Sequence, residues 1–263
     1  MKIAIIDADI IGRKKHRFPN LACEKIAGYW KDQGAEVQLV TTWPTAIEMT
    51  QPWWDELYVS KVFTDTAVPD YLDVEEHVHL GGTGFFFDRA KDLPEEIEHH
   101  MPDYHLYDSW IEVKVQHAAE AYADFNELKF RKQFKEYTDY SIGFLTRGCF
   151  RHCPFCVNQK YDKVVKHSPL EEFYDPSRKK LCFLDDNFFG CPDWHELLTQ
   201  VMETKVPFKF KQGLDERLLS VEKIELLKEA RYDGYITFAF DDSKDYDIIE
   251  SKLKLIREEG LAI

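Results

Sequence analysis

The sequence has few cysteines and no long apolar run. Six cysteines in 263 residues are too few for the disulfide scaffold of a small secreted protein. The apolar stretch at the N-terminus is broken by Asp7 and Asp9, so it fits neither a signal peptide nor a membrane span. Hydrophobic residues make up 44% and charged residues 31%, as in an ordinary globular protein. We therefore expect a cytoplasmic protein without a membrane partner.

Basic residues are in the minority, and the formal net charge is -14. Such a charge repels a polyanion at long range and disfavours nucleic acid as a partner. The segment Arg13–Arg17 is a local basic run, which we interpret as a solvated loop.

The first 87 residues alternate short apolar segments with one amphipathic helix. A strand is expected at Lys2–Asp7, and a helix at Asn20–Gln33 with Asn20 as its N-cap. Further strands are expected at Glu36–Val40, Glu56–Phe63 and His77–Leu80. The pattern predicts an α/β fold, with residues 1–87 forming a doubly wound, Rossmann-like domain.

Residues 88–138 are rich in charges and aromatic side chains. We expect one helix over Trp110–Phe134 and interpret the whole segment as a connector whose aromatic residues are buried in an interface.

From residue 139 onward, strands and helices alternate. This order predicts parallel strands with right-handed crossovers, and so a TIM-type (β/α) barrel over residues 139–263. A full barrel takes about 250 residues, whereas about 120 follow Tyr140, so we expect an incomplete barrel and a fragment of a longer protein. Strands are expected at Ser141–Thr146, Lys180–Leu184, Pro207–Lys211 and Tyr235–Phe240, and helices from a capping box at Ser168 and over Pro192–Thr204, Val221–Ala230 and Asp247–Glu259.

The most informative segment holds three of the six cysteines. Cys149, Cys153 and Cys156 have the spacing C-x3-C-x2-C on a loop that follows an expected strand. Three thiolates on one short loop can bind a single metal centre. Because four cysteines saturate a cubane iron–sulfur cluster, three leave one iron without a protein ligand.

The alternative is a zinc site completed by His152 or His167. Zinc knuckles usually pair two short cysteine or histidine units, and no second unit is present, so we favour a cluster. A non-catalytic iron–sulfur or zinc-binding module remains the competing function.

The cysteine segment resembles the signature of the radical S-adenosylmethionine (SAM) superfamily. The segment Phe183–Phe188, Phe-Leu-Asp-Asp-Asn-Phe, is similar to the motif after the second barrel strand in members with a cobalamin-type N-terminal domain. The resemblance implies a 4Fe-4S cluster that cleaves SAM to a 5'-deoxyadenosyl radical, which abstracts hydrogen from an unidentified substrate. It also implies an electron donor such as flavodoxin or ferredoxin.

The resemblance also assigns roles by position. The three cysteines would be the metal ligands, and the remaining residues would contact SAM. An internal ion pair between Asp215 and Arg217 is an equally open reading of that part of the chain. The expected SAM contacts are Phe155 at the adenine, Asp185, Asp186 and Asn187 at the amino group, Gln212 and Arg217 at SAM or substrate, and Asp241 at the ribose.

The segment Asp7–Gly12 resembles the cobalamin motif D-x-H-x-x-G, with Asp9 in place of the metal-coordinating histidine. Any cobalamin would therefore bind without that lower ligand, and a cobalamin-dependent methyltransferase depends on this altered motif. A methylthiotransferase is disfavoured because Cys23 stands alone where that group has a second cysteine triad. Hydrogen abstraction from a peptide or small molecule is the default expectation.

Overall fold

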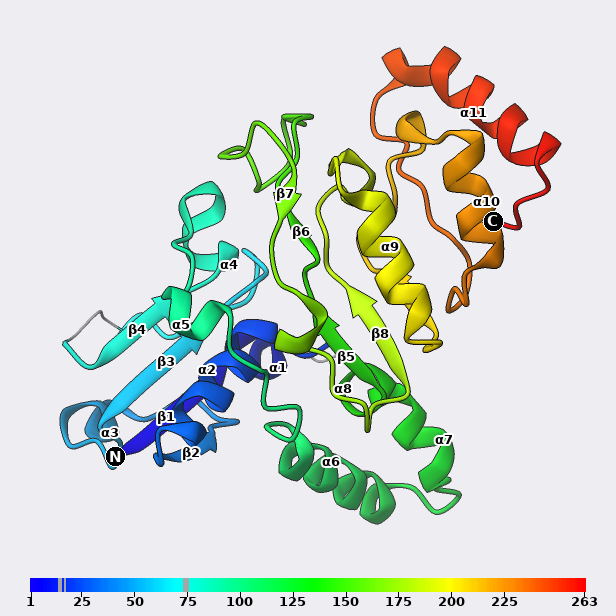
Figure 1. The fold of residues 1–263 in the computed structure, drawn as a ribbon. Helices are drawn as coiled ribbons and strands as arrows, with labels where there is room; N and C mark the ends of the chain where they lie inside the picture. Colours follow the sequence, from blue (N-terminus) through cyan, green and yellow to red (C-terminus); the bar gives the residue numbers. More distant parts are fainter. Residues whose placement is uncertain (14–15, 17, 73–75) are drawn as a thin grey trace. The chain divides into compact units, whose positions relative to one another are not determined.

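The computed structural model describes residues 1–13, 16, 18–72 and 76–263, and the chain divides into two compact units, Met1–Asp139 and Tyr140–Ile263 (Figure 1). Each unit is α/β and contains its own parallel sheet. Lys14, Lys15 and Arg17 of the basic run lie outside the described residues. Within the described part of the chain, no helix has the length and apolar character needed to cross a membrane.

Unit 1 is built on a four-stranded parallel sheet in the order β2-β1-β3-β4. The central strand β1 is buried at every residue after Lys2. Its side chains alternate between two hydrophobic clusters, with Ile3 and Ile5 in one and Ala4 and Ile6 in the other. The four expected strands of this region are confirmed. Their bounds are Lys2–Asp7 for β1, Glu36–Leu39 for β2, Glu56–Ser60 for β3 and Val78–Gly81 for β4.

The helix expected after β1 is also confirmed, as α2 (Leu21–Asp32). Asn20 is its N-cap, and the side-chain oxygen of Asn20 accepts a hydrogen bond from the Cys23 backbone N–H at 3.3 Å. Four shorter helices lie in the segments that connect or follow the strands of unit 1. They are α1 (Ala8–Gly12), α3 (Ala46–Thr50), α4 (Thr83–Phe86) and α5 (Glu95–Glu98).

The single helix expected over Trp110–Phe134 is wrong, because the chain forms α6 (Asp108–Ala121), α7 (Glu127–Arg131) and α8 (Lys135–Thr138) instead. Asn126 starts α7 by accepting a hydrogen bond from the Lys129 backbone N–H at 2.9 Å, a local bond that competes with helix continuation. Aromatic residues in and beside these helices pack with β1 in one hydrophobic core. They include Tyr107, Trp110, Phe134 and Tyr137, together with Ile3 and Ile5.

Unit 2 has a three-stranded parallel sheet in the order β5-β8-β9. A two-stranded antiparallel sheet, β6 with β7, rises from the end of β5 (Figure 1). The strands are β5 (Tyr140–Gly143), β6 (Thr146–Arg147), β7 (Val165–Lys166), β8 (Lys180–Phe183) and β9 (Phe208–Phe210). The helices are α9 (Trp194–Glu203), α10 (Val221–Glu229) and α11 (Tyr246–Glu258), which confirm the last three expected helices.

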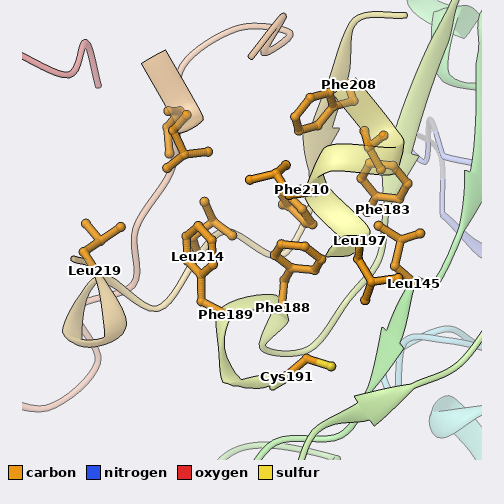
Figure 2. Packing of buried hydrophobic residues seen from close by; sticks show 14 of the residues in the cluster. Leu145, Phe183, Phe188, Phe189, Cys191, Leu197, Phe208, Phe210, Leu214 and Leu219 are labelled. Carbon is orange, nitrogen blue, oxygen red and sulfur yellow. The ribbon is translucent and has the colours of Figure 1, made fainter. Parts of the chain in front are cut away.

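Phenylalanines and leucines from strands, helices and loops form much of the core of unit 2 (Figure 2). Phe183 is fully buried, and the rings of Phe188 and Phe210 lie with centroids 4.5 Å apart. Leu197 of α9 packs into the same core. This core fixes the loops that follow β8 and β9, because Phe188 and Leu214 belong to those loops.

Two expectations for unit 2 are wrong. The segment Tyr235–Phe240 forms no strand; Phe238 makes only an isolated bridge to Leu214, and Tyr235 is 84% exposed, so the segment lacks a continuous buried face. The helix expected from Ser168 is only a 3-10 turn at Leu170–Glu172. Pro176 follows shortly afterwards, and a proline disfavours helical geometry in the residue before it.

Candidate metal centre

The three clustered cysteines lie on one loop, residues 148–164, which connects β6 to β7 and is called the cysteine loop below. All three thiols are partly exposed and none is disulfide-bonded. Gly148 begins the loop with a φ of +99°, and a Cβ there would lie 2.3 Å from the Lys163 carbonyl oxygen. Only glycine permits this close approach between the two ends of the loop.

Asp185, directly after β8, holds the base of the cysteine loop. Its carboxylate accepts hydrogen bonds from the backbone N–H groups of Leu145 and Thr146, at 3.2 and 2.7 Å, and from the Thr146 hydroxyl at 2.6 Å. Burial raises the pKa of Asp185 to about 7, although these hydrogen bonds oppose the shift. The oxygens of Asp185 are thus directed at the chain segment that leads into the loop.

Asp186 holds the loop at two further points. Its carboxylate accepts from the Gly148 backbone N–H at 2.9 Å and from the Asn158 side-chain amide at 2.5 Å. The start and the middle of the cysteine loop are therefore tied to one residue of the loop that follows β8.

Asn187 reaches the first cysteine. Its side-chain N–H group donates to Cys149 Sγ at 3.5 Å and to Asp215 Oδ2 at 3.2 Å. Because the Asp215 carboxylate can only accept, this contact fixes the orientation of the amide. Asn187 Oδ1 is buried and has no hydrogen-bond partner among the described residues. The Asn187 amide thus contacts Cys149 through its nitrogen, and its oxygen is left without a partner in the described structure.

The second and third cysteines are held by bonds within the loop. The Cys156 backbone N–H donates to the Cys153 carbonyl at 2.9 Å, and the Asn158 backbone N–H donates to Cys156 Sγ at 3.4 Å. The Gln159 side chain donates to the carbonyl oxygens of both cysteines. The turn between these two thiols is therefore shaped by the chain itself.

Burial raises the pKa of the Cys153 thiol, and the nearby charges of Cys149, Asp241 and Cys156 add to the shift, whereas Arg217 opposes it. Both other thiols, Asp241 and Arg217 thus lie within electrostatic range of Cys153. In the described part of the chain, no three His, Cys, Asp or Glu side chains are already arranged to hold a metal ion.

The chemistry of the donor set fits an iron–sulfur cluster better than zinc. His152 pairs with Asp162 at 3.1 Å, and the His167 ring lies 3.0 Å from the Ser168 hydroxyl. Both histidines that could complete a zinc site thus have another partner, and the three thiols are the soft ligands that the loop offers. Three thiols with no fourth protein ligand are the set that a cubane with one open iron requires.

The other expected SAM contacts lie at the surface or in ion pairs. Phe155 is 65% exposed on the cysteine loop, and Gln212 and Asp241 are also exposed. Arg217 donates from Nε to Asp215 Oδ1 at 2.6 Å and also pairs with Asp245, so the internal ion pair is present.

The sequence reasoning missed Arg151, which lies between the first two cysteines. Arg151 Nε donates to Asp215 Oδ2 at 2.7 Å and so joins the cysteine loop to the segment after β9. The only sequence signal for this contact is an arginine inside the cysteine spacing, with an aspartate after a later strand.

In unit 1, the aspartates of the cobalamin-like motif are buried and bonded within the protein. Asp9 accepts from the Val62 backbone N–H at 2.8 Å and from the Thr66 hydroxyl. Asp7 caps α1 and accepts from the Tyr107 hydroxyl at 2.8 Å. Neither carboxylate is presented to a ligand, so these residues do not fit a cobalt ligand set and no cobalamin chemistry is derived from them.

No protein-family model matches this chain, and none of the curated proteins or solved structures matches it significantly. The functional conclusion therefore depends on the thiols of the cysteine loop and on the side chains that hold it.

Proposed function

We propose that this chain is a radical SAM enzyme in which Cys149, Cys153 and Cys156 bind a 4Fe-4S cluster. The observation that carries the proposal is a loop of three thiols held from the end of β8, with the Asn187 amide donating to Cys149 Sγ and keeping its own oxygen unpartnered. A thiol-only set of three leaves one iron open for the amino and carboxylate groups of SAM.

The positions of these residues relative to the strands support the proposal. The cysteine loop follows β5 and β6, Asn187 follows β8, and Asp215 follows β9, and the strands β5, β8 and β9 run parallel. In parallel α/β folds, the carboxyl ends of the strands form the binding edge. We accordingly interpret unit 2 as part of a TIM-type barrel and unit 1 as a Rossmann-like domain.

When bound and reduced by an external electron donor, the cluster would supply one electron to break the bond between the sulfur and the 5' carbon of SAM, giving methionine and a 5'-deoxyadenosyl radical that would remove a hydrogen atom from a substrate. The chain's own residues position the reactants. Asp185 and Asp186 hold the loop. Asn187 Oδ1, which has no partner in the described structure, would be the acceptor for the ammonium group of SAM. The proposal assigns no role to cobalamin.

SAM cleavage tests the proposal directly. The wild-type protein, reconstituted anaerobically with iron and sulfide and reduced with dithionite, should convert SAM to 5'-deoxyadenosine, whereas Cys153→Ala should not. Cys191→Ala is the matched control, because Cys191 is buried in the core of unit 2 and lies outside the cysteine loop.

Two outcomes contradict the proposal. Iron-loaded wild-type protein that makes no 5'-deoxyadenosine would favour a binding module. A protein that purifies with one zinc per chain and takes up no iron would indicate a zinc site.

A further inference from the structure

Asp215 is the point at which four segments of unit 2 meet. Asp215 Oδ2 accepts from Arg151 Nε at 2.7 Å and from Asn187 Nδ2 at 3.2 Å. Asp215 Oδ1 accepts from Arg217 Nε at 2.6 Å and from the Arg217 backbone N–H at 3.3 Å. Arg217 in turn pairs with Asp245, directly before α11.

The geometry leaves Asp215 little capacity to bind a ligand itself. A carboxylate has about four acceptor positions, and the protein's own donors approach both oxygens of Asp215. The side chain is only 6% exposed. Any influence of Asp215 on the site must therefore act through the groups that it orients.

Those groups lie at the first two cysteines. Arg151 is two residues from both Cys149 and Cys153 in the sequence, and Asn187 donates to Cys149 Sγ from the same amide nitrogen that contacts Asp215. Without the carboxylate, the Arg151 guanidinium loses its anchor and the Asn187 amide loses the contact that fixes its orientation.

We propose that Asp215 is a positioning residue that, through Arg151 and Asn187, restricts the positions of Cys149 and Cys153 and so favours their binding to a metal centre. The role in metal binding depends on the proposed function, whereas the positioning of the thiols does not. Asp215 thus acts before any metal arrives, by limiting the conformations of the cysteine loop.

The first test uses metal-free protein and measures the rate at which iodoacetamide modifies each thiol, resolved by peptide mass spectrometry. Asp215→Asn keeps nearly the same shape but replaces one acceptor oxygen by an amide N–H group. That group faces one of the N–H donors that now bind Asp215, so at least one hydrogen bond is lost. We expect Asp215→Asn to accelerate modification of Cys149 and Cys153 by about tenfold, the factor for losing one charge-assisted hydrogen bond.

Arg151→Gln separates positioning from electrostatics. Removal of the negative charge of Asp215 and removal of the positive charge of Arg151 shift thiol reactivity in opposite directions, whereas loss of positioning accelerates modification in both variants. The double variant Asp215→Asn/Arg151→Gln should react no faster than Asp215→Asn alone, because both changes break the same contact.

Asp233→Asn is the matched control. Asp233 also pairs with a basic side chain, Lys180 at 2.6 Å, and accepts from the Tyr140 hydroxyl, but these partners are the first residues of β8 and β5, at the other end of the sheet. In the Asp233→Asn variant, Cys149 and Cys153 should react with iodoacetamide at the wild-type rates, within about twofold.

The second test measures how fast a chelator removes iron from cluster-loaded protein, and Asp215→Asn should accelerate the loss while Asp233→Asn should not. The inference is overturned if Asp215→Asn leaves thiol modification unchanged, or if Asp233→Asn accelerates it equally. A wild-type protein that takes up no iron refutes the proposed function alone, because the thiol rates still decide the role of Asp215.

Discussion

Asp7 should make the stability of unit 1 depend on pH. The carboxyl is fully buried, and burial, aided by the charge of Asp9, raises its pKa to about 7 despite the hydrogen bond from Tyr107. Burial also raises the pKa values of Tyr107 and Cys23, which face Asp7, so both stay neutral below pH 8. Asp7 is therefore the group in this contact that titrates between pH 4 and 7.

The sign of the effect follows from proton binding. In the unfolded chain Asp7 ionises near its ordinary pKa of 3.8, whereas the folded state keeps the proton until about pH 7. The folded state binds more protons in this window, so the free energy of unfolding falls as pH rises from about 4 to 7. Between pH 5 and 7 the loss amounts to about 2 kcal/mol.

Asp7→Asn removes this titration while retaining the cap of α1, because an asparagine oxygen also accepts the Asp9 backbone N–H. Urea denaturation at pH 5 and pH 7 should therefore show the variant gaining about 2 kcal/mol relative to the wild type between the two values. Asp124→Asn, at an exposed position, is the control and should parallel the wild type. Parallel curves for Asp7→Asn would refute the reasoning.

Three further changes test the fold. Asp185→Ala leaves the buried donors of Thr146 unpaired and should lower the free energy of unfolding by about 3 kcal/mol in urea titrations; an unchanged midpoint would contradict its anchoring role. Phe183→Ala should cost about 4 kcal/mol by the same assay, and a loss below 1 kcal/mol would show that the core of unit 2 is packed differently. Gly148→Ala should destabilise the protein more than Gly34→Ala, whose added methyl group meets no atom, and should expose the cysteine loop to proteolysis; equal effects would count against the contact with Lys163.

The sequence predicted the regular elements well where local signals agree. Residues 3–6 are continuously apolar between Lys2 and Asp7, and Asn20 is followed by an amphipathic segment, so β1 and α2 could be located from the pattern alone. Residues 235–240 are also apolar in part, but only Ile236 is buried, while Tyr235 and Phe240 are exposed. Which of these side chains are buried depends on tertiary packing, which periodicity does not contain.

The sequence predicts which thiols belong to the candidate site, but it does not predict the hydrogen bonds that hold the cysteine loop. The cysteine spacing identifies the loop, and the position of Asp185 after a strand identifies its neighbour. The contacts that hold the loop join residues far apart in sequence, such as Arg151 with Asp215, and a single sequence gives no measure of such pairs.

The most direct test of the account is the EPR spectrum of the reduced, iron-loaded protein before and after addition of SAM. An open iron on the cluster held by Cys149, Cys153 and Cys156 should bind SAM, so the account predicts a 4Fe-4S signal whose shape changes on addition. A spectrum that saturating SAM leaves unchanged would contradict the central claim, because it would show a cluster without an accessible iron.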